Sequence, residues 1–201
     1  ETSVVHWGSA GDIPVIGDYD GDSINDLAVF RPADGNWYVR RSSDGSAFIL
    51  HWGMAGDRPV SGDFDGDGRN DLAIFRPSLG DWYVNRSSDG GMTAMHWGSN
   101  GDMPVAGDFD GDGTADVAVF RPTDGNWYIY RSTDGNATVQ HFGIAGDIPV
   151  ACEFDGDGIS DIAVFRPADG NWYIMRSTNN TFAAYHFGIP TDRPVPASYT
   201  P

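Results

Sequence analysis

The sequence predicts an all-β protein built from four repeated four-stranded units. A His-aromatic-Gly motif recurs every 45 residues, at 6–8, 51–53, 96–98, 141–143 and 186–188, with no insertion or deletion between copies. Short apolar segments alternate with turns rich in Gly, Pro, Asp and Ser, and no segment keeps a helical period for more than a turn. Four strands in ~40–45 residues are typical of a β-propeller blade.

The repeat that begins near residue 57 illustrates the four strands. Residues 59–63 (PVSGD) lead into an acidic loop, and residues 71–76 (DLAIFR) are apolar on both faces, as a buried strand requires. A Pro-Gly turn precedes residues 82–86 (WYVNR), where large side chains alternate. A Ser-Asp-Gly turn then leads into residues 92–97 (MTAMHW), the fourth strand.

The same pattern predicts blades over 12–53, 57–98, 102–143 and 147–188 of one repeat domain spanning 1–201. One further strand is predicted at each end, over residues 2–7 and 193–199. These two strands either cover a four-bladed ring or share an incomplete fifth blade that lacks its two middle strands. In the second case a neighbouring chain helps to fill the gap, because unpaired strand edges invite pairing.

Between the first two strands of each repeat lies a loop with acidic residues at positions 1, 3, 5 and 9. Alternating carboxylates with intervening glycines supply the six to eight oxygen ligands that a hard cation such as Ca²⁺ needs. At position 7 the backbone carbonyl is the expected ligand, so that side chain is free to vary. We therefore predict one Ca²⁺ in each of four loops.

The predicted metal ligands are Asp18, Asp20, Asp22, Ile24 and Asp26; Asp63, Asp65, Asp67, Arg69 and Asp71; Asp108, Asp110, Asp112, Thr114 and Asp116; and Glu153, Asp155, Asp157, Ile159 and Asp161. Two loops depart from the pattern, because Ser23 replaces a glycine and Glu153 replaces the leading aspartate. We expect these two sites to be weaker or differently coordinated.

Charge narrows the classes of partner. The formal net charge is −17, and the four loops hold 16 of the 29 acidic residues, so the acidity is largely a property of the predicted metal sites. No basic face exists to neutralise phosphates, which argues against nucleic acid. No apolar run of 18 residues exists that could span a membrane. Calcium sites of modest affinity belong outside the cell, so an extracellular location, secreted or cell-surface, is expected.

The residues around the acidic loop also resemble a known family. Phe142-Gly143, then Gly146-Asp147-Ile148-Pro149-Val150 and the acidic loop, are similar to an FG-GAP repeat of the VCBS type. This resemblance covers nearly the whole chain and implies a calcium-loaded propeller like those of integrin α subunits and bacterial surface proteins. The repeat is shorter than the integrin repeat, there are fewer than seven blades, and Gly-Asp-x-Pro replaces Gly-Ala-Pro, so integrin-type ligand recognition is not implied.

Repeated aromatic residues are the candidate ligand-binding side chains. Alternation along the third strand places one ring of each Trp-Tyr pair on each face, so a ring either packs between blades or stacks on a sugar. The candidates for stacking are Trp37, Trp82, Trp127 and Trp172. The five histidines occupy one repeat position and are expected to bond a neighbouring turn or blade, with a role in a repeated ligand pocket as the alternative. The arginines of the Phe-Arg-Pro motifs are expected to pair with carboxylates or turn carbonyls, with an anion clamp as the alternative.

No catalytic motif is present: there is no nucleophile elbow, phosphate-binding glycine loop or HExxH sequence. A non-catalytic, lectin-like protein is predicted, for cell adhesion or for recognition of a carbohydrate or other cell-surface or matrix ligand. One alternative is a structural protein, either an architectural module or a filament subunit that self-associates through its edge strands. Another is the accessory domain of a larger enzyme.

Overall fold

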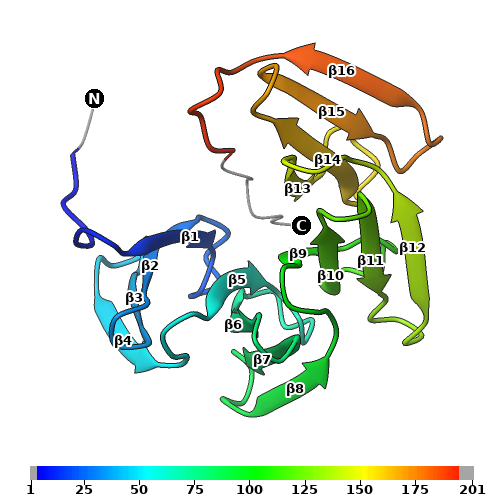
Figure 1. Ribbon diagram of the computed structural model, residues 1–201. Helices are drawn as coiled ribbons and strands as arrows, with labels where there is room; N and C mark the ends of the chain where they lie inside the picture. The colour runs from blue at the N-terminus through cyan, green and yellow to red at the C-terminus, as the bar shows by residue number, and fades with distance from the viewer. Residues whose placement is uncertain (1–3, 195–201) are drawn as a thin grey trace.

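The computed structural model describes residues 4–194, which form sixteen β-strands in four antiparallel sheets. Each sheet contains four strands that are consecutive in the chain, so each repeat forms one blade. The four blades surround a common centre as a propeller (Figure 1), which confirms the predicted all-β propeller. In the described part of the chain no helix is long and apolar enough to cross a membrane.

The blades repeat one set of strand lengths. The first blade contains β1 (Ile13–Gly17), β2 (Asp26–Arg31), β3 (Asn36–Arg40) and β4 (Ala47–His51). The second contains β5 (Arg58–Gly62), β6 (Asp71–Arg76), β7 (Asp81–Asn85) and β8 (Met92–His96). The third contains β9 (Met103–Gly107), β10 (Asp116–Arg121), β11 (Asn126–Tyr130) and β12 (Ala137–His141). The fourth contains β13 (Ile148–Cys152), β14 (Asp161–Arg166), β15 (Asn171–Met175) and β16 (Phe182–His186).

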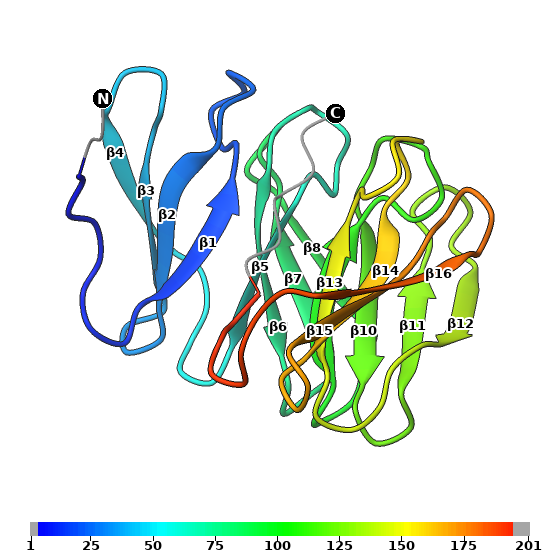
Figure 2. The ribbon, with the colours of Figure 1, turned by 90° about the horizontal axis from the view of Figure 1, so that it is seen from above.

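The first strand of each blade lies innermost. Strand β5 contacts both β1 and β9, and β9 contacts β13, whereas the fourth strands lie at the periphery (Figure 1). Turned by 90°, the molecule shows its connecting loops gathered at the two ends of the strands (Figure 2). The acidic loops, which join first to second strands, therefore lie at one end of each blade.

The core lies between neighbouring blades. In the second blade, Phe75 and Trp82 are cross-strand partners, both fully buried, and they pack against Val119 and Tyr128 of the third blade. The glycine of the His-aromatic-Gly motif makes this contact fit. Gly98 has φ of +137°, and a Cβ there would lie 2.9 Å from a ring carbon of Phe75, so only glycine allows this approach.

The ring is open on one side, between the fourth and first blades (Figure 1): β13 and β1 make no contact comparable to those between the other inner strands. The predicted strand over 2–7 is not formed in the described residues 4–7, and residues 1–3 lie outside them. Arg193 and Pro194 are not in a strand either, and the rest of the predicted strand 193–199 lies outside the described residues. A strand needs a hydrogen-bonded neighbour, and the shared blade has no middle strands to supply one.

Candidate metal centres and the polar surface between blades

The backbone of each acidic loop is wrapped around its first carboxylate. In the second loop, one oxygen of Asp63 accepts hydrogen bonds from the N–H groups of Gly66 (2.6 Å) and Asp67 (3.2 Å), and the other accepts from Gly68 (2.8 Å). Asp108 does the same in the third loop. These bonds turn the loop tightly, so that the carboxylates at positions 1, 3 and 9 converge.

The carboxylate at position 9 anchors the loop to the blade. Asp71 is fully buried and accepts hydrogen bonds from the N–H groups of Phe64 (2.9 Å) and Ser87 (2.7 Å). Burial nevertheless raises the pKa of Asp71 to about 6, against the lowering effect of those bonds, and the pKa of Asp116 is raised to about 6 in the same way. Holding such a group ionised in the fold calls for a nearby positive charge.

A bound cation is indicated most directly by the aspartate at position 3. Its Oδ1 atom is buried and has no hydrogen-bond partner at the same place in all four loops, in Asp20, Asp65, Asp110 and Asp155. Three carboxylates in each loop also have oxygens within 4.8 Å of one another. A buried carboxylate oxygen without a partner is costly. Each of the four loops contains one such oxygen within a cluster of carboxylates, and a ligand set made of oxygen atoms fits a hard divalent cation.

Hydroxyl groups from the turn after the third strand complete each site. Ser87 donates to Oδ1 of Asp67 (2.8 Å) and Ser88 donates to Oδ2 of Asp65 (2.6 Å), so the turn orients both carboxylates. The equivalent donors are Ser42, Ser43, Ser132, Thr133, Ser177 and Thr178. Sequence analysis missed this role, although the signal was present: a pair of hydroxyl residues follows an arginine at the same place in each repeat.

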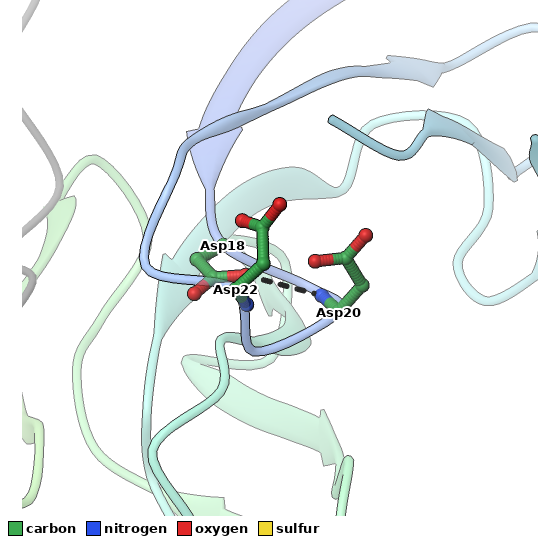
Figure 3. Close-up of side chains that lie close together, drawn as sticks. All are labelled: Asp18, Asp20 and Asp22. Atoms are coloured by element: carbon green, nitrogen blue, oxygen red, sulfur yellow. Dashed lines mark hydrogen bonds between the residues drawn. The ribbon is translucent and has the colours of Figure 1, made fainter. Parts of the chain in front are cut away.

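The first and fourth loops differ from the middle two. In the first loop the converging carboxylates are those of Asp18, Asp20 and Asp22 (Figure 3), and Ser23 adopts φ of +66°, a left-handed conformation that favours glycine. In the fourth loop Glu153 takes the leading position and accepts hydrogen bonds from the N–H groups of Asp155 (2.7 Å) and Gly158. The longer glutamate therefore preserves the loop's internal hydrogen bonds.

At position 7 of each loop the backbone N–H donates a hydrogen bond to the carboxylate at position 5. The N–H of Arg69 donates to Asp67 (2.9 Å), and Ile24, Thr114 and Ile159 repeat this bond. This bond orients the position-5 carboxylate and leaves the Arg69 side chain exposed. The expected role of the four position-7 carbonyls as metal ligands stays a prediction.

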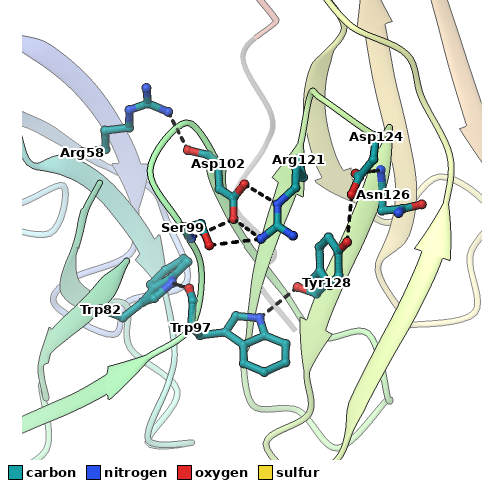
Figure 4. A network of polar contacts seen from close by, with 9 residues as sticks. All are labelled: Arg58, Trp82, Trp97, Ser99, Asp102, Arg121, Asp124, Asn126 and Tyr128. Atoms are coloured by element: carbon teal, nitrogen blue, oxygen red, sulfur yellow. Dashed lines mark hydrogen bonds and ion pairs between the residues drawn. The ribbon is translucent and has the colours of Figure 1, made fainter. Parts of the chain in front are cut away.

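A second repeated set of polar side chains surrounds the arginine of each Phe-Arg-Pro motif, as Figure 4 shows for Arg121. Arg121 makes a bidentate ion pair with Asp102, both bonds at 2.8 Å, and its guanidinium lies 4.3 Å from the ring centre of Tyr128, whose hydroxyl donates to Asp124. The same ion pair forms in every blade, as Arg31–Asp12, Arg76–Asp57 and Arg166–Asp147. Each of the four arginines is thus paired with a carboxylate of the protein, as the sequence predicted. Because these carboxylates already bind the guanidinium groups, the alternative of a clamp for an external anion is disfavoured.

Histidine side chains extend this polar surface. Nδ1 of His51 lies 3.1 Å from Oδ1 of Asn36, and Nδ1 of His96 lies 2.8 Å from Oδ1 of Asp81. His141 and His186 make the equivalent contacts with Asn126 and Asn171. These four histidines therefore contact their cross-strand partners at the start of the third strand of the same blade. A structural contact was predicted, but the partner is a strand residue and not a turn or a neighbouring blade.

Three of the four tryptophans predicted for sugar stacking are core residues, and the prediction is wrong for them. Trp37, Trp82 and Trp127 are fully buried, because the facing blade covers their rings, and each indole N–H donates at 2.9 Å to a backbone carbonyl. A ring without accessible surface cannot stack on a ligand. Trp172 is only half-buried, so it alone keeps this candidate role.

Comparison with a family model agrees with this geometry. Residues 63–119 match the FG-GAP-like repeat. The matched segment runs from the second acidic loop into β10, so it spans one loop-to-loop period of the propeller. The four-bladed propeller agrees with FG-GAP-type propeller repeats. No curated protein matches the chain in sequence.

Solved structures share the fold at low sequence identity. A lectin from Agrocybe aegerita specific for non-reducing terminal N-acetylglucosamine superposes with a TM-score of 0.56 and 17% identity, over 89% of this chain and 53% of the lectin. Virginiamycin B lyase from Staphylococcus aureus gives 0.54 and 15%, over 89% and 56%. BBS1N, in complex with ARL6DN, gives 0.51 and 13%, over 87% and 56%. The chain thus spans about half the length of these proteins.

Proposed function

We propose that the protein is an extracellular, calcium-stabilised propeller that recognises a carbohydrate or another cell-surface or matrix ligand in adhesion, without catalysis. One observation carries the calcium assignment: the same carboxylate oxygen is buried without a partner in each of the four acidic clusters. Ca²⁺ accepts six to eight oxygens at variable geometry, whereas Mg²⁺ demands a smaller octahedral site. The extracellular location follows from the free Ca²⁺ concentrations that such loops require.

Calcium here has a structural role. It binds the folded loops and not the unfolded chain, so each site adds RT ln(1 + [L]/Kd) to the free energy of unfolding. At a free Ca²⁺ concentration of 100 Kd this is about 2.7 kcal/mol for each site. The loops bond to the turns after the third strands, as Ser87 and Ser88 show, so the ion also fixes the relative positions of two connections in each blade.

Ligand recognition is assigned to the repeated polar turns. Each blade presents an exposed histidine beside an Asn or Asp, and in three blades a tyrosine hydroxyl bonds an acidic turn residue, as in Asp124 and Tyr128. Convergent polar groups over a partly exposed aromatic ring suit the hydroxyls and apolar faces of a sugar. Four weak sites on one rigid body gain avidity toward a repeating glycan. Because a lectin is among the proteins of similar fold, glycans are the first ligands that we would test.

The test is a glycan array probed in millimolar Ca²⁺ and again in EDTA, with thermal unfolding measured under both conditions. Glycan binding that is lost in EDTA, together with a lower unfolding temperature, supports the proposal. Unfolding that is unaffected by Ca²⁺ overturns the calcium assignment. A blank array in both buffers overturns glycan recognition and leaves a protein ligand to be sought.

A second candidate function is favoured by the open side of the ring. A propeller with uncovered end blades suits an architectural module or filament subunit, and self-association through its terminal edges would then be its activity. Sedimentation over a range of protein concentrations separates the two functions. Growth in mass with concentration favours the architectural role, and a constant monomer mass argues against it.

A further inference from the structure

The fourth blade exposes an aromatic face that the other three blades bury. Phe187 is 80% exposed, whereas Trp52, Trp97 and Phe142, its equivalents, are half-buried. Phe154 is also exposed, and Trp172 is uncovered in part. Together with Ile174, Arg176 and Tyr185 these rings line a hollow of about 410 Å³.

The interior of the propeller shows what chemistry covers such a face. The equivalent face of the second blade is covered by Val117 and Val119 of β10 and by Tyr128 and Tyr130 of β11, with Ala106 of β9 beside them. The indole N–H of Trp97 donates to the carbonyl of Tyr128 (3.0 Å). Apart from Ala106, all of these groups come from the middle two strands of the next blade. A matching occupant is therefore a β-hairpin with an aliphatic pair on one strand and a tyrosine on the other.

Asp192 gives a second, independent indication. Asp102 closes its turn by accepting from the N–H of Ser99 (2.9 Å), and Asp192 closes its own turn by accepting from Ile189 (2.9 Å). An equivalent aspartate lies just before the first strand of each of the four blades. It pairs with an arginine in the second strand of that same blade, as Asp102 pairs with Arg121. Asp192 is exposed and pairs with no arginine among residues 4–194. The hairpin that fits this end therefore also carries an arginine.

The first blade, on the opposite side of the opening, shows how much of the space is already filled. Leu27 is 44% exposed, whereas Leu72, Val117 and Ile162 at the same position are buried. Trp7 nevertheless lies where a preceding blade's aromatic would lie, because its indole N–H donates to the carbonyl of Tyr38 (3.2 Å), as Trp52 does to Tyr83. Trp7 thus supplies the outer aromatic contact on the first blade. The surface that stays uncovered there, at Leu27, is one that the second and third strands of a neighbouring blade cover elsewhere.

We propose that the open side of the propeller, bounded by the aromatic face of the fourth blade and by Leu27 of the first, binds a β-hairpin of the kind formed by the second and third strands of these blades. The hairpin supplies an aliphatic pair against Trp172, an arginine for Asp192 and a tyrosine beneath Phe187. Continuity with the three interfaces between neighbouring blades identifies this occupant, since the exposed groups are those that the next blade covers. The proposal concerns the end face and is independent of glycan binding at the polar turns.

The test uses the full chain in millimolar Ca²⁺ and a synthetic peptide with the sequence of residues 26–41 (DLAVFRPADGNWYVRR), which is itself a middle hairpin. An isolated hairpin is only marginally stable in water, so a backbone-cyclised form of the peptide is titrated in parallel. Calorimetry is expected to show saturable binding of one peptide per chain. Asp192→Asn is expected to weaken binding at least about tenfold, since a charge-assisted pair is lost, and Phe187→Ser to weaken it similarly or more.

Matched controls separate the face from the rest of the surface. Asp44→Asn and Met92→Ser alter an exposed acid and an exposed apolar residue elsewhere, and are expected to leave the affinity unchanged. A peptide with Arg31→Ala is expected to bind as weakly to the native chain as to the Asp192→Asn chain, because both changes remove the same ion pair.

Three results overturn the proposal. One is the absence of binding by both the linear and the cyclised peptide. Another is binding that neither Asp192→Asn nor Phe187→Ser affects. The third is a dimer of the chain, seen in sedimentation, that Phe187→Ser converts to a monomer, because a second copy would then be the occupant of this face.

Discussion

The two interior blades and the two end blades share one repeat but not one environment. The second and third blades have neighbours on both sides, their third-strand tryptophans, Trp82 and Trp127, are fully buried, and their acidic loops follow the regular pattern. The first and fourth blades each have one uncovered face and one irregular loop, with Ser23 in one and Glu153 in the other. Whether the aromatic face of a blade is covered therefore depends on the neighbouring blade, because the repeats themselves are alike in sequence.

The largest expected difference concerns one aromatic position. Trp82→Ala is expected to lower the free energy of unfolding by about 3–5 kcal/mol, because it empties a closed site. Trp172→Ala is expected to cost about 1–2 kcal/mol, because this ring is already partly hydrated. Urea unfolding in saturating Ca²⁺ measures both. Equal losses for the two variants would show that the fourth blade's face is covered in solution.

When the metal is removed, the free energy of unfolding is expected to depend on pH through the second and third acidic loops. The folded-state pKa values of Asp71 and Asp116, about 6, exceed the unfolded value near 3.8. Their contribution to stability is therefore fully present below about pH 4 and is lost as the pH rises through 6, by up to about 3 kcal/mol per carboxyl. Urea midpoints in EDTA between pH 4 and 7 test this. Ca²⁺ should abolish the trend by favouring the ionised form, and a trend that persists in Ca²⁺ would contradict the metal assignment.

Removing the unpartnered carboxylate should distinguish the loops. Asp65→Asn is expected to abolish one Ca²⁺ site and about 2.7 kcal/mol of stabilisation at a free Ca²⁺ concentration of 100 Kd. Asp155→Asn, in the loop led by Glu153, is expected to cost less, since that site is predicted to be weaker. Calorimetric titration with Ca²⁺ should give three sites in each variant and four in the native chain. Four sites in Asp65→Asn would rule out this ligand.

The smallest expected effect is conformational. Ser23→Gly is expected to stabilise the protein by about 0.5–1 kcal/mol, because glycine adopts the left-handed conformation at no steric cost. The matched change Gly68→Ser, at φ of +85° in the second loop, is expected to destabilise by a similar amount. Urea midpoints of the two variants measure these effects. A Ser23→Gly chain no more stable than the native one would mean that the Ser23 side chain contributes its own stabilising contact.

Much of the protein was predictable because the repeat is strict. The 45-residue period predicted four complete blades and left open a shared fifth, and the acidic loops and the pairing of the arginines followed from short motifs within it. The Ser and Thr hydroxyls that orient the carboxylates were missed. They lie 20 or 23 residues from their partners in the sequence, and hydroxyl pairs in turns have many other uses.

The local chemistry follows from the sequence alone. Large side chains alternate along the third strands, glycines permit the turns, and the carboxylates at positions 1, 3, 5 and 9 bring several oxygen ligands into each loop. Only the tertiary structure decided which copies of a residue are covered. Trp82 and Trp172 occupy one position in the repeat, yet one is buried and the other is exposed in part. The physical reason is that burial belongs to the contact between two blades, and a repeat does not encode whether a neighbour is there.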